Sequence, residues 1–147
     1  LDRHWRTPAR NEEFLAHLRS MENPIPLGFM TGSIDLLFQH DGRFYVVDWK
    51  SNRLDGRPES FGPAGVAREM AVSLYYLQYL IYTVAVDGFL RRALAGYDYE
   101  RYFGGVFYLF LRGIDRRQPA HGIFFDRPGQ GCIEALSAEL MRGEEQP

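Results

Sequence analysis

Two runs of eight residues with the composition of β-strands, separated by Asp41-Gly42, constrain the fold of this chain more than any other feature. The runs cover residues 33–40 and 43–50. An Asp-Gly pair between two strand-like runs is the strongest short-range signal for a β-hairpin with a two-residue turn. The sequence therefore predicts an antiparallel hairpin over residues 33–50.

A two-residue turn also determines which residues face each other across the hairpin. His40 then faces Arg43, and Asp35 faces Asp48 with their Cβ atoms roughly 4.5–5.5 Å apart. Lys50 lies on the same face as Asp48, because side chains alternate between the two faces along a strand. A three-residue turn with a glycine bulge would shift this register, and the sequence alone leaves that alternative open.

Most other residues of the hairpin are apolar on both predicted faces, which makes two facing acids unusual. The apolar residues of one face are Ile34, Leu36, Phe38, Tyr45, Val47 and Trp49, and those of the other are Leu37, Phe44 and Val46. Facing like charges destabilise a sheet, and burying an uncompensated carboxylate is costly. A divalent cation between Asp35 and Asp48 removes both costs, and Mg²⁺ is commonly held by one or two carboxylates. The other interpretation is a surface ion pair between Asp48 and Lys50, with Asp35 in solvent.

Lys50 is the only lysine of the chain, in which Lys and Arg together number 17. An ammonium is a compact point charge that can also give up its proton. A guanidinium spreads its charge and keeps its proton. Such a group can orient or help deprotonate a water molecule, or stabilise charge that develops on a phosphoryl oxygen. The combination of facing acids and a solitary lysine favours a catalytic site.

Segments of helical and strand-like pattern surround this hairpin. Helices are expected over residues 11–21, 66–95 and 133–142, and strands over residues 104–112 and 122–125. Gly88 is expected to kink or divide the second helix. Residues 51–65 are rich in Gly, Pro, Ser and charge, which predicts a loop. The order of these segments predicts an α/β layered domain, a mixed sheet with helices packed on it.

Length and composition fit one cytoplasmic domain over residues 1–147, with enough apolar side chains for a core. Hydrophobic residues make up 46% and charged residues 24% of the chain. Cys132 is the only cysteine, which excludes an internal disulfide, a Cys-rich zinc site and a four-cysteine iron–sulfur cluster. We find no secretory signal and no membrane-spanning run. The net charge of −2 does not indicate nucleic-acid binding by itself.

The chain resembles the C-terminal nuclease domains of the RecB family, which belong to the PD-(D/E)xK nucleases, over about residues 28–127. The resemblance is carried, in this order, by GSIDLLFQHDGRFYVVDWKSN, LQYLIYTVAV and YDYERYFGGVFYLFLRGID. It implies a restriction-endonuclease-like mixed β-sheet with flanking helices, in which the central antiparallel hairpin carries the active site. The implied activity is Mg²⁺-dependent exodeoxyribonuclease cleavage, with Mn²⁺ as an alternative cation.

The resemblance also implies roles by position. Asp35 and Asp48 would be metal-binding carboxylates, the backbone carbonyl of Trp49 a further metal ligand, and Lys50 the catalytic lysine. RecB-type nucleases usually have a histidine metal ligand on a helix well upstream of the first of these aspartates. We expect that element to lie before the start of this chain.

Gln78 and Tyr82 match the QxxxY element of RecB-type nucleases, which lies beside the active site. Their spacing of four places both on one helix face. The alternative for Gln78 is a glutamine satisfied by the backbone or by solvent. The histidines of the chain are expected to be structural or exposed rather than ligands; they are His4, His17, His40 and His121.

The resemblance implies DNA as substrate, RecC-like and RecD-like subunits as partners in double-strand-break repair and recombination, and a recombinase as a possible further partner. Arg53, Arg57 and Arg112 are candidates for contacts with DNA phosphates. Two other classes stay open. One is a non-catalytic nuclease-like module that binds partner subunits or a recombinase. The other is a structural domain in which Asp35, Asp48 and Lys50 form a small ion network.

Overall fold

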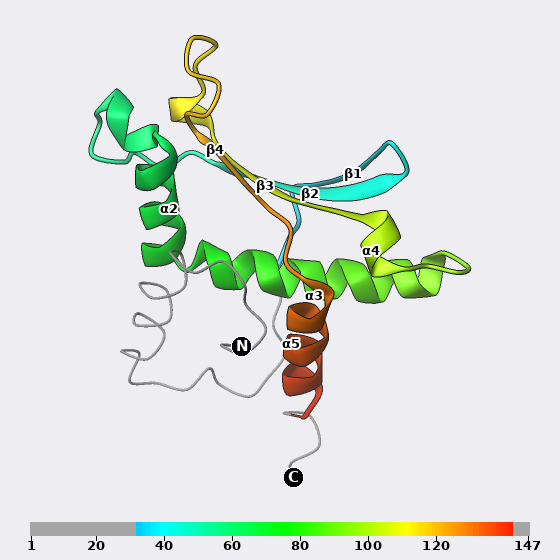
Figure 1. Cartoon of the computed structure of the whole chain (residues 1–147). Helices are drawn as coiled ribbons and strands as arrows, with labels where there is room; N and C mark the ends of the chain where they lie inside the picture. The colour runs from blue at the N-terminus through cyan, green and yellow to red at the C-terminus, as the bar shows by residue number, and fades with distance from the viewer. Residues whose placement is uncertain (1–31, 143–147) are drawn as a thin grey trace.

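The computed structural model describes residues 32–142, which form a four-stranded sheet with the order β1-β2-β3-β4 (Figure 1). The strands are β1 (Leu36–His40), β2 (Arg43–Lys50), β3 (Phe103–Phe110) and β4 (Ile123–Asp126). β2 and β3 are parallel, and the other two pairs are antiparallel. This mixed sheet with its helices confirms the predicted α/β class.

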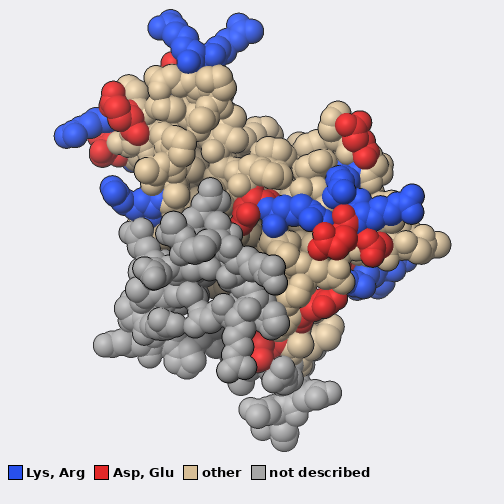
Figure 2. Space-filling view, viewed as in Figure 1, with Lys and Arg blue, Asp and Glu red and all other residues tan. Residues whose placement is uncertain are grey.

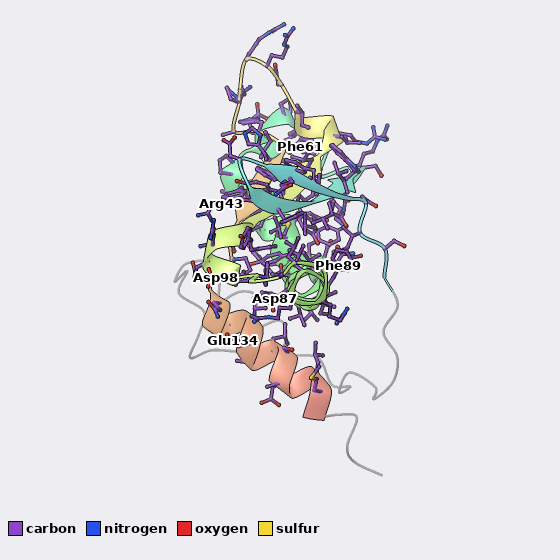
Figure 3. The ribbon with its side chains drawn as sticks, turned by 90° about the vertical axis from the view of Figure 1, so that its right-hand side faces the viewer. Arg43, Phe61, Asp87, Phe89, Asp98 and Glu134 are labelled. Carbon is purple, nitrogen blue, oxygen red and sulfur yellow. The ribbon has the colours of Figure 1, made fainter. Side chains whose placement is uncertain are left out.

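The long helices lie on one side of the sheet. They are α2 (Pro63–Val72), α3 (Tyr75–Ala93) and α5 (Gln130–Arg142), with a short α4 (Tyr99–Tyr102) and two 3-10 turns, η1 (Pro58–Phe61) and η2 (Leu111–Gly113). Helix α3 crosses beneath the strands, and α5 lies beyond it (Figure 1). The view along α3 shows the same order of sheet, α3 and α5 (Figure 3). None of the helices between residues 32 and 142 combines the length and apolar character needed to cross a bilayer.

The hairpin has the predicted two-residue turn. Asp41 and Gly42 both have positive φ, 47° and 76°, as a type I′ turn requires. His40 pairs with Arg43 and Leu36 with Val47, which is the register that this turn sets. The glycine-bulge alternative is therefore excluded. β2 has the predicted bounds, whereas β1 begins three residues later than expected.

The predicted helix over residues 66–95 is two helices, and the division is not at Gly88. Gly88 lies inside the unbroken α3. The break comes at Ser73 and Leu74, where Leu74 adopts φ 56° and turns the chain between α2 and α3. The side chain of Ser73 donates a hydrogen bond of 2.7 Å to Glu69 Oε1, which holds the end of α2.

The remaining boundaries differ from the prediction by a few residues. The expected loop over residues 51–65 contains η1 and the first turn of α2, where Pro63 occupies a position that needs no backbone donor. β3 ends at Phe110, so Arg112 lies in η2 rather than in a strand. Helix α5 begins three residues before the predicted start, and α4 was not predicted. The helix predicted over residues 11–21 lies outside the described residues.

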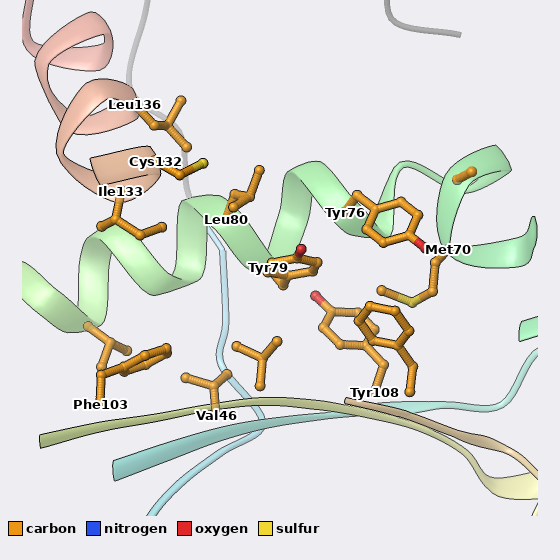
Figure 4. Close-up of a cluster of buried hydrophobic side chains, with 14 of the residues drawn as sticks. Val46, Met70, Tyr76, Tyr79, Leu80, Phe103, Tyr108, Cys132, Ile133 and Leu136 are labelled. Atoms are coloured by element: carbon orange, nitrogen blue, oxygen red, sulfur yellow. The ribbon is translucent and has the colours of Figure 1, made fainter. Parts of the chain in front are cut away.

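The core has two layers of apolar side chains (Figure 4). Val46, Phe103, Tyr79 and Tyr108 fill the space between the sheet and α3, and Leu80, Cys132, Ile133 and Leu136 fill the space between α3 and α5. The Tyr79 hydroxyl donates to Asp126 Oδ2 at 2.7 Å, so this buried polar group has a partner. The two layers hold α3 between the sheet and α5.

The sheet face away from the helices carries several exposed apolar side chains, so the prediction that the hairpin is buried on both sides is wrong. Leu36, Trp49, Ile123 and Phe125 are 41%, 45%, 37% and 45% exposed. No helix of the part shown as a ribbon lies over this face (Figure 1). Because side chains alternate along β2, Asp48 and Lys50 point to the helical side while Trp49 points away from it.

Two glycine substitutions test this account of the turn and of α3. Gly42→Ala is expected to destabilise the protein by about 1–2 kcal/mol, because φ is 76° although a Cβ would meet nothing within 4 Å. Gly88→Ala is expected to stabilise it by about 0.5–1 kcal/mol, since that position is inside a helix and has room for a methyl group. Urea unfolding of both variants measures the two effects. Equal effects of the same sign would contradict the assigned backbone conformations.

Candidate active site

Two carboxylates lie at the end of the hairpin away from its turn. Asp35 directly precedes β1, whose pairing with β2 begins at Leu36 and Val47. Asp35 Oδ2 accepts a hydrogen bond of 2.9 Å from the backbone N–H of Trp49, the residue after Asp48. Asp35 is exposed, whereas Asp48 is only 4% exposed. The charge of Asp35 is therefore felt by the buried Asp48 from a position in solvent.

Lys50 and Asp48 form an ion pair that is buried rather than on the surface. Lys50 Nζ lies 2.6 Å from Asp48 Oδ1, and the two side chains are 11% and 6% exposed. A charge in such surroundings requires close partners, because losing water costs several kcal/mol per ion. The surface ion pair considered from the sequence is therefore the wrong description of these two residues.

The pKa of Asp48 is raised above the ordinary value of 3.8. Burial is the largest cause, the hydrogen bond and charge of Lys50 act in the opposite direction, and the charge of Asp35 raises the pKa further. The balance means that Lys50 does not fully compensate the buried carboxylate. A further positive charge near Asp35 and Asp48 would therefore be stabilised at this position.

Helix α3 supplies the residues of the predicted QxxxY element. Lys50 Nζ donates to Gln78 Oε1 at 2.9 Å, and Gln78 Nε2 donates to the Tyr82 hydroxyl at 3.1 Å. Gln78 and Tyr82 are four residues apart on one face of α3, as the spacing predicts. Gln78 is thus satisfied by side chains rather than by backbone, and a cavity of about 470 Å³ opens beside it along α3.

The sequence prediction missed two tyrosines that enclose the lysine. Lys50 Nζ lies 3.8 Å from the ring centroid of Tyr75 and 5.0 Å from that of Tyr108. The Tyr108 hydroxyl also donates to Gln78 Oε1 at 3.0 Å, and burial raises the Tyr108 pKa so that the hydroxyl keeps its proton. Tyr75 precedes Gln78 by three, so helical spacing could have indicated it.

The residues suit a hard divalent cation. Asp35 and Asp48 offer carboxylate oxygens, and the backbone carbonyl of Trp49, between Asp48 and Lys50 in the sequence, offers another oxygen. The buried charge of Asp48 is only partly compensated by Lys50. Within residues 32–142 there is no group of three or more His, Cys, Asp and Glu side chains that would hold a metal on its own.

The histidines of the described part of the chain lie away from this site. His40 is exposed at the hairpin turn, 3.4 Å from Asp41, as expected of a residue that is not a ligand. His121 lies next to Gly62, before α2. His4 and His17 fall outside the described residues.

Exposed arginines follow the ends of β2 and β3, which is also the end that carries Lys50. Arg53 and Arg57 lie in the segment after β2, and Arg112 donates from Nε to the Ser51 carbonyl at 3.0 Å. The segment between η2 and β4 adds Arg116 and Arg117, which the sequence analysis did not single out. Figure 2 shows basic side chains at the tip of this segment. Positive charge is therefore available for a polyanion at the end of the sheet that carries Lys50.

A mixed sheet whose hairpin presents an aspartate, a second aspartate and a lysine two residues later is the arrangement that defines PD-(D/E)XK nucleases. The sequence profile of the PD-(D/E)XK nuclease superfamily matches residues 2–142, so the chain belongs to this superfamily.

The relatives of this chain include proteins named RecBCD enzyme subunit RecB. The chain is 46% identical over 116 residues to that of Escherichia coli K12, which covers 79% of this chain and 10% of that protein. It is 47% identical over 109 residues to that of Haemophilus influenzae, a match that covers 74% of this chain and 9% of that protein. It is 37% identical over 124 residues to that of Mycobacterium tuberculosis H37Rv, a match that covers 79% of this chain and 11% of that protein. The chain thus spans about a tenth of the length of these relatives.

The shifted carboxyl gives a pH prediction for the metal-free protein. In carboxyl NMR the pKa of Asp48 is expected to lie above 3.8. The substitution Asp35→Asn is expected to lower the pKa of Asp48, because it removes a repelling charge. The folded protein then keeps a proton that the unfolded chain releases. As pH rises from 3.8 through the folded pKa, the stability of the wild type relative to Asp48→Asn should fall. An Asp48 carboxyl that titrates below 3.8 would contradict this account.

Proposed function

We propose that residues 1–147 form one divalent-metal-dependent nuclease domain of a longer protein, which hydrolyses phosphodiester bonds of DNA as an exodeoxyribonuclease. The observation that carries the proposal is the buried Asp48–Lys50 pair opposite Asp35, joined through Gln78 to α3. Membership of the nuclease superfamily and similarity to RecB support it.

Asp35, Asp48 and the carbonyl of Trp49 are the groups that would hold Mg²⁺, or Mn²⁺ in its place. When bound there, the cation supplies positive charge that relieves the two acids and polarises the scissile phosphate. Asp48 lies on β2, and Asp35 directly precedes β1 and is held by the Trp49 backbone N–H at 2.9 Å, so paired strands and a backbone hydrogen bond support both acids. This makes the donor set pre-organised before the substrate arrives.

Lys50 is the residue that acts on the phosphate or on the attacking water. Its ammonium is fixed by Asp48 at 2.6 Å and by Gln78 at 2.9 Å, and an ammonium has three donors. The remaining donor can stabilise the charge that develops on a phosphoryl oxygen, or orient the water for attack. Gln78 and Tyr82 hold the lysine in this position from α3.

DNA is bound through its phosphates, for which Arg53, Arg57 and Arg112 are the proposed contacts. Such contacts give affinity that depends strongly on salt and little on sequence. The names of the relatives further support a longer protein that works with RecC-like and RecD-like subunits in break repair and recombination. These partners follow from similarity to RecB alone.

Removal of the acids or of the lysine tests the proposal. Asp35→Ala, Asp48→Ala and Lys50→Ala should each lower Mg²⁺- or Mn²⁺-dependent degradation of linear DNA by at least on the order of 10²-fold, as for removal of one stabilising group at a reaction centre. Asp41→Asn is the matched control, because it removes an exposed charge at the other end of the same hairpin and asparagine tolerates the positive φ of this turn position. Equal activity in all four variants and the wild type would end the nuclease proposal.

Metal binding has its own readout. Mg²⁺ should raise the melting temperature of the wild type and of Asp41→Asn, and should leave the melting temperature of Asp48→Ala unchanged, because only a ligand that binds the folded state stabilises it. A purely structural ion network at this position predicts no response to Mg²⁺ in any variant.

A second candidate function has one observation in its favour. The sheet face that carries Leu36, Trp49, Ile123 and Phe125 is apolar and exposed in the described part of the chain. Large exposed apolar patches mark sites of protein contact. The corresponding proposal is a module that binds partner subunits or a recombinase, with catalysis secondary or absent.

Substitutions on that face separate the two functions. Trp49→Ser together with Phe125→Ser should weaken copurification with RecC-like and RecD-like subunits in the full-length protein, while DNA cleavage stays within a few-fold, because the Trp49 backbone carbonyl is retained. Asp48→Ala should abolish DNA cleavage and leave copurification with these subunits unchanged. If the paired serine substitutions leave assembly intact, the apolar face is not the binding surface.

A further inference from the structure

Tyr75, the first residue of α3, lies against the lysine of the site although it does not belong to the QxxxY element. Its ring centroid is 3.8 Å from Lys50 Nζ, closer than the 5.0 Å to Tyr108. An ammonium within about 6 Å of an aromatic face is attracted to it, and the attraction grows when water is excluded. Lys50 is 8% exposed, so the contact operates in a largely dry environment.

The hydroxyl of Tyr75 is held by a group of polar side chains behind the site. It lies 3.1 Å from Nδ2 and 3.2 Å from Oδ1 of Asn52. Asn52 Nδ2 also donates to Glu69 Oε1 at 2.8 Å, and Ser73 donates to the same oxygen at 2.7 Å. The segment after β2 and the end of α2 thus both fix one tyrosine ring.

The backbone turns sharply at Leu74, directly before Tyr75, and the Tyr75 ring lies against Lys50. Leu74 has φ 56°, in the left-handed region that a leucine rarely adopts. The turn allows α3 to begin directly after α2 ends at Val72, so that its first side chain reaches the end of β2. Such strain persists only where surrounding contacts hold it, and it often accompanies functional sites.

We propose that Tyr75 is a positioning residue that holds the Lys50 ammonium against Asp48 and Gln78, and that Asn52 and Glu69 act through Tyr75. The proposal rests on the proposed nuclease function, in which the position of Lys50 matters for the rate. Without the ring, the four-carbon side chain of Lys50 loses the surface that restricts it, while Asp48 and Gln78 keep their own places. The consequence is a lysine that is charged but less well placed.

The solitary lysine provides a measurement that does not depend on catalysis. Lysine labelled with ¹³C gives one set of side-chain NMR signals in this chain, since Lys50 is its only lysine. Protons held over an aromatic ring resonate upfield, so the Lys50 ε-methylene should lie upfield of a solvated lysine. Tyr75→Leu should remove most of this shift, Tyr75→Phe should keep most of it, and Asn52→Ala should reduce it.

Activity provides the second measurement. Tyr75→Leu should lower kcat for DNA cleavage by about 2- to 30-fold, the range that a cation–aromatic contact supports, with KM nearly unchanged. Tyr75→Phe should recover most of that loss because it restores the ring. Tyr102→Leu is the control: it removes a half-buried tyrosine on α4, away from Lys50, and should alter neither kcat nor the lysine signal.

The outcomes separate this proposal from the nuclease function itself. A lysine signal in Tyr75→Leu at the wild-type position overturns the proposal, and so does a loss of kcat in Tyr75→Phe equal to that in Tyr75→Leu. A wild-type chain that cleaves no DNA, but whose lysine signal moves as expected, counts against the nuclease function and supports the placement of Lys50 by Tyr75.

Discussion

The ion pair of Lys50 and Asp48, buried between β2 and α3, is the interaction on which the rest of this structure depends. Two charges at 2.6 Å in an apolar interior are stable only when further polar groups and aromatic faces surround them. β2 supplies the pair itself, α3 supplies Tyr75 and Gln78, and β3 supplies Tyr108. These three elements also contribute the main apolar layer between sheet and helix. The buried pair is therefore held by the same three elements that form this apolar layer.

The hairpin could be predicted because its geometry is local. A two-residue turn with positive φ at Asp41 and Gly42 sets every facing pair from His40 with Arg43 to Leu36 with Val47. The spacing of Gln78 and Tyr82 is likewise local to one helix, so their common face followed from the sequence. The parallel pairing of β2 with β3 joins segments far apart along the chain. No short-range pattern indicates that Tyr108 lies beside Asp48, and this is why the sequence analysis missed it.

The division between α2 and α3 shows how a local signal misleads. Gly88 was the obvious candidate for a break, yet a glycine inside a helix lowers stability by only about 1 kcal/mol relative to alanine, which tertiary contacts easily offset. The break lies at Ser73 and Leu74, and leucine carries no signal for left-handed backbone. The apolar residues on both faces of the hairpin mislead in a similar way. They report side-chain chemistry on each face but not whether a partner covers that face, and Leu36 and Trp49 are exposed.

The use of one lysine among sixteen arginines follows from the shape of its surroundings. An ammonium places three donors around one nitrogen, and in the described chain Asp48 and Gln78 take two of them while the Tyr75 ring lies 3.8 Å away. A guanidinium spreads its charge over a planar fork that suits two parallel acceptors and does not fit among groups that converge on a point. Arg53, Arg57 and Arg112 lie on exposed segments that follow the ends of β2 and β3, where such a fork suits the paired oxygens of a phosphate backbone. Arg43 and Arg127 instead hold backbone carbonyls of α4 and of the first residue of β3. The solitary lysine thus occupies the position where a compact charge is needed.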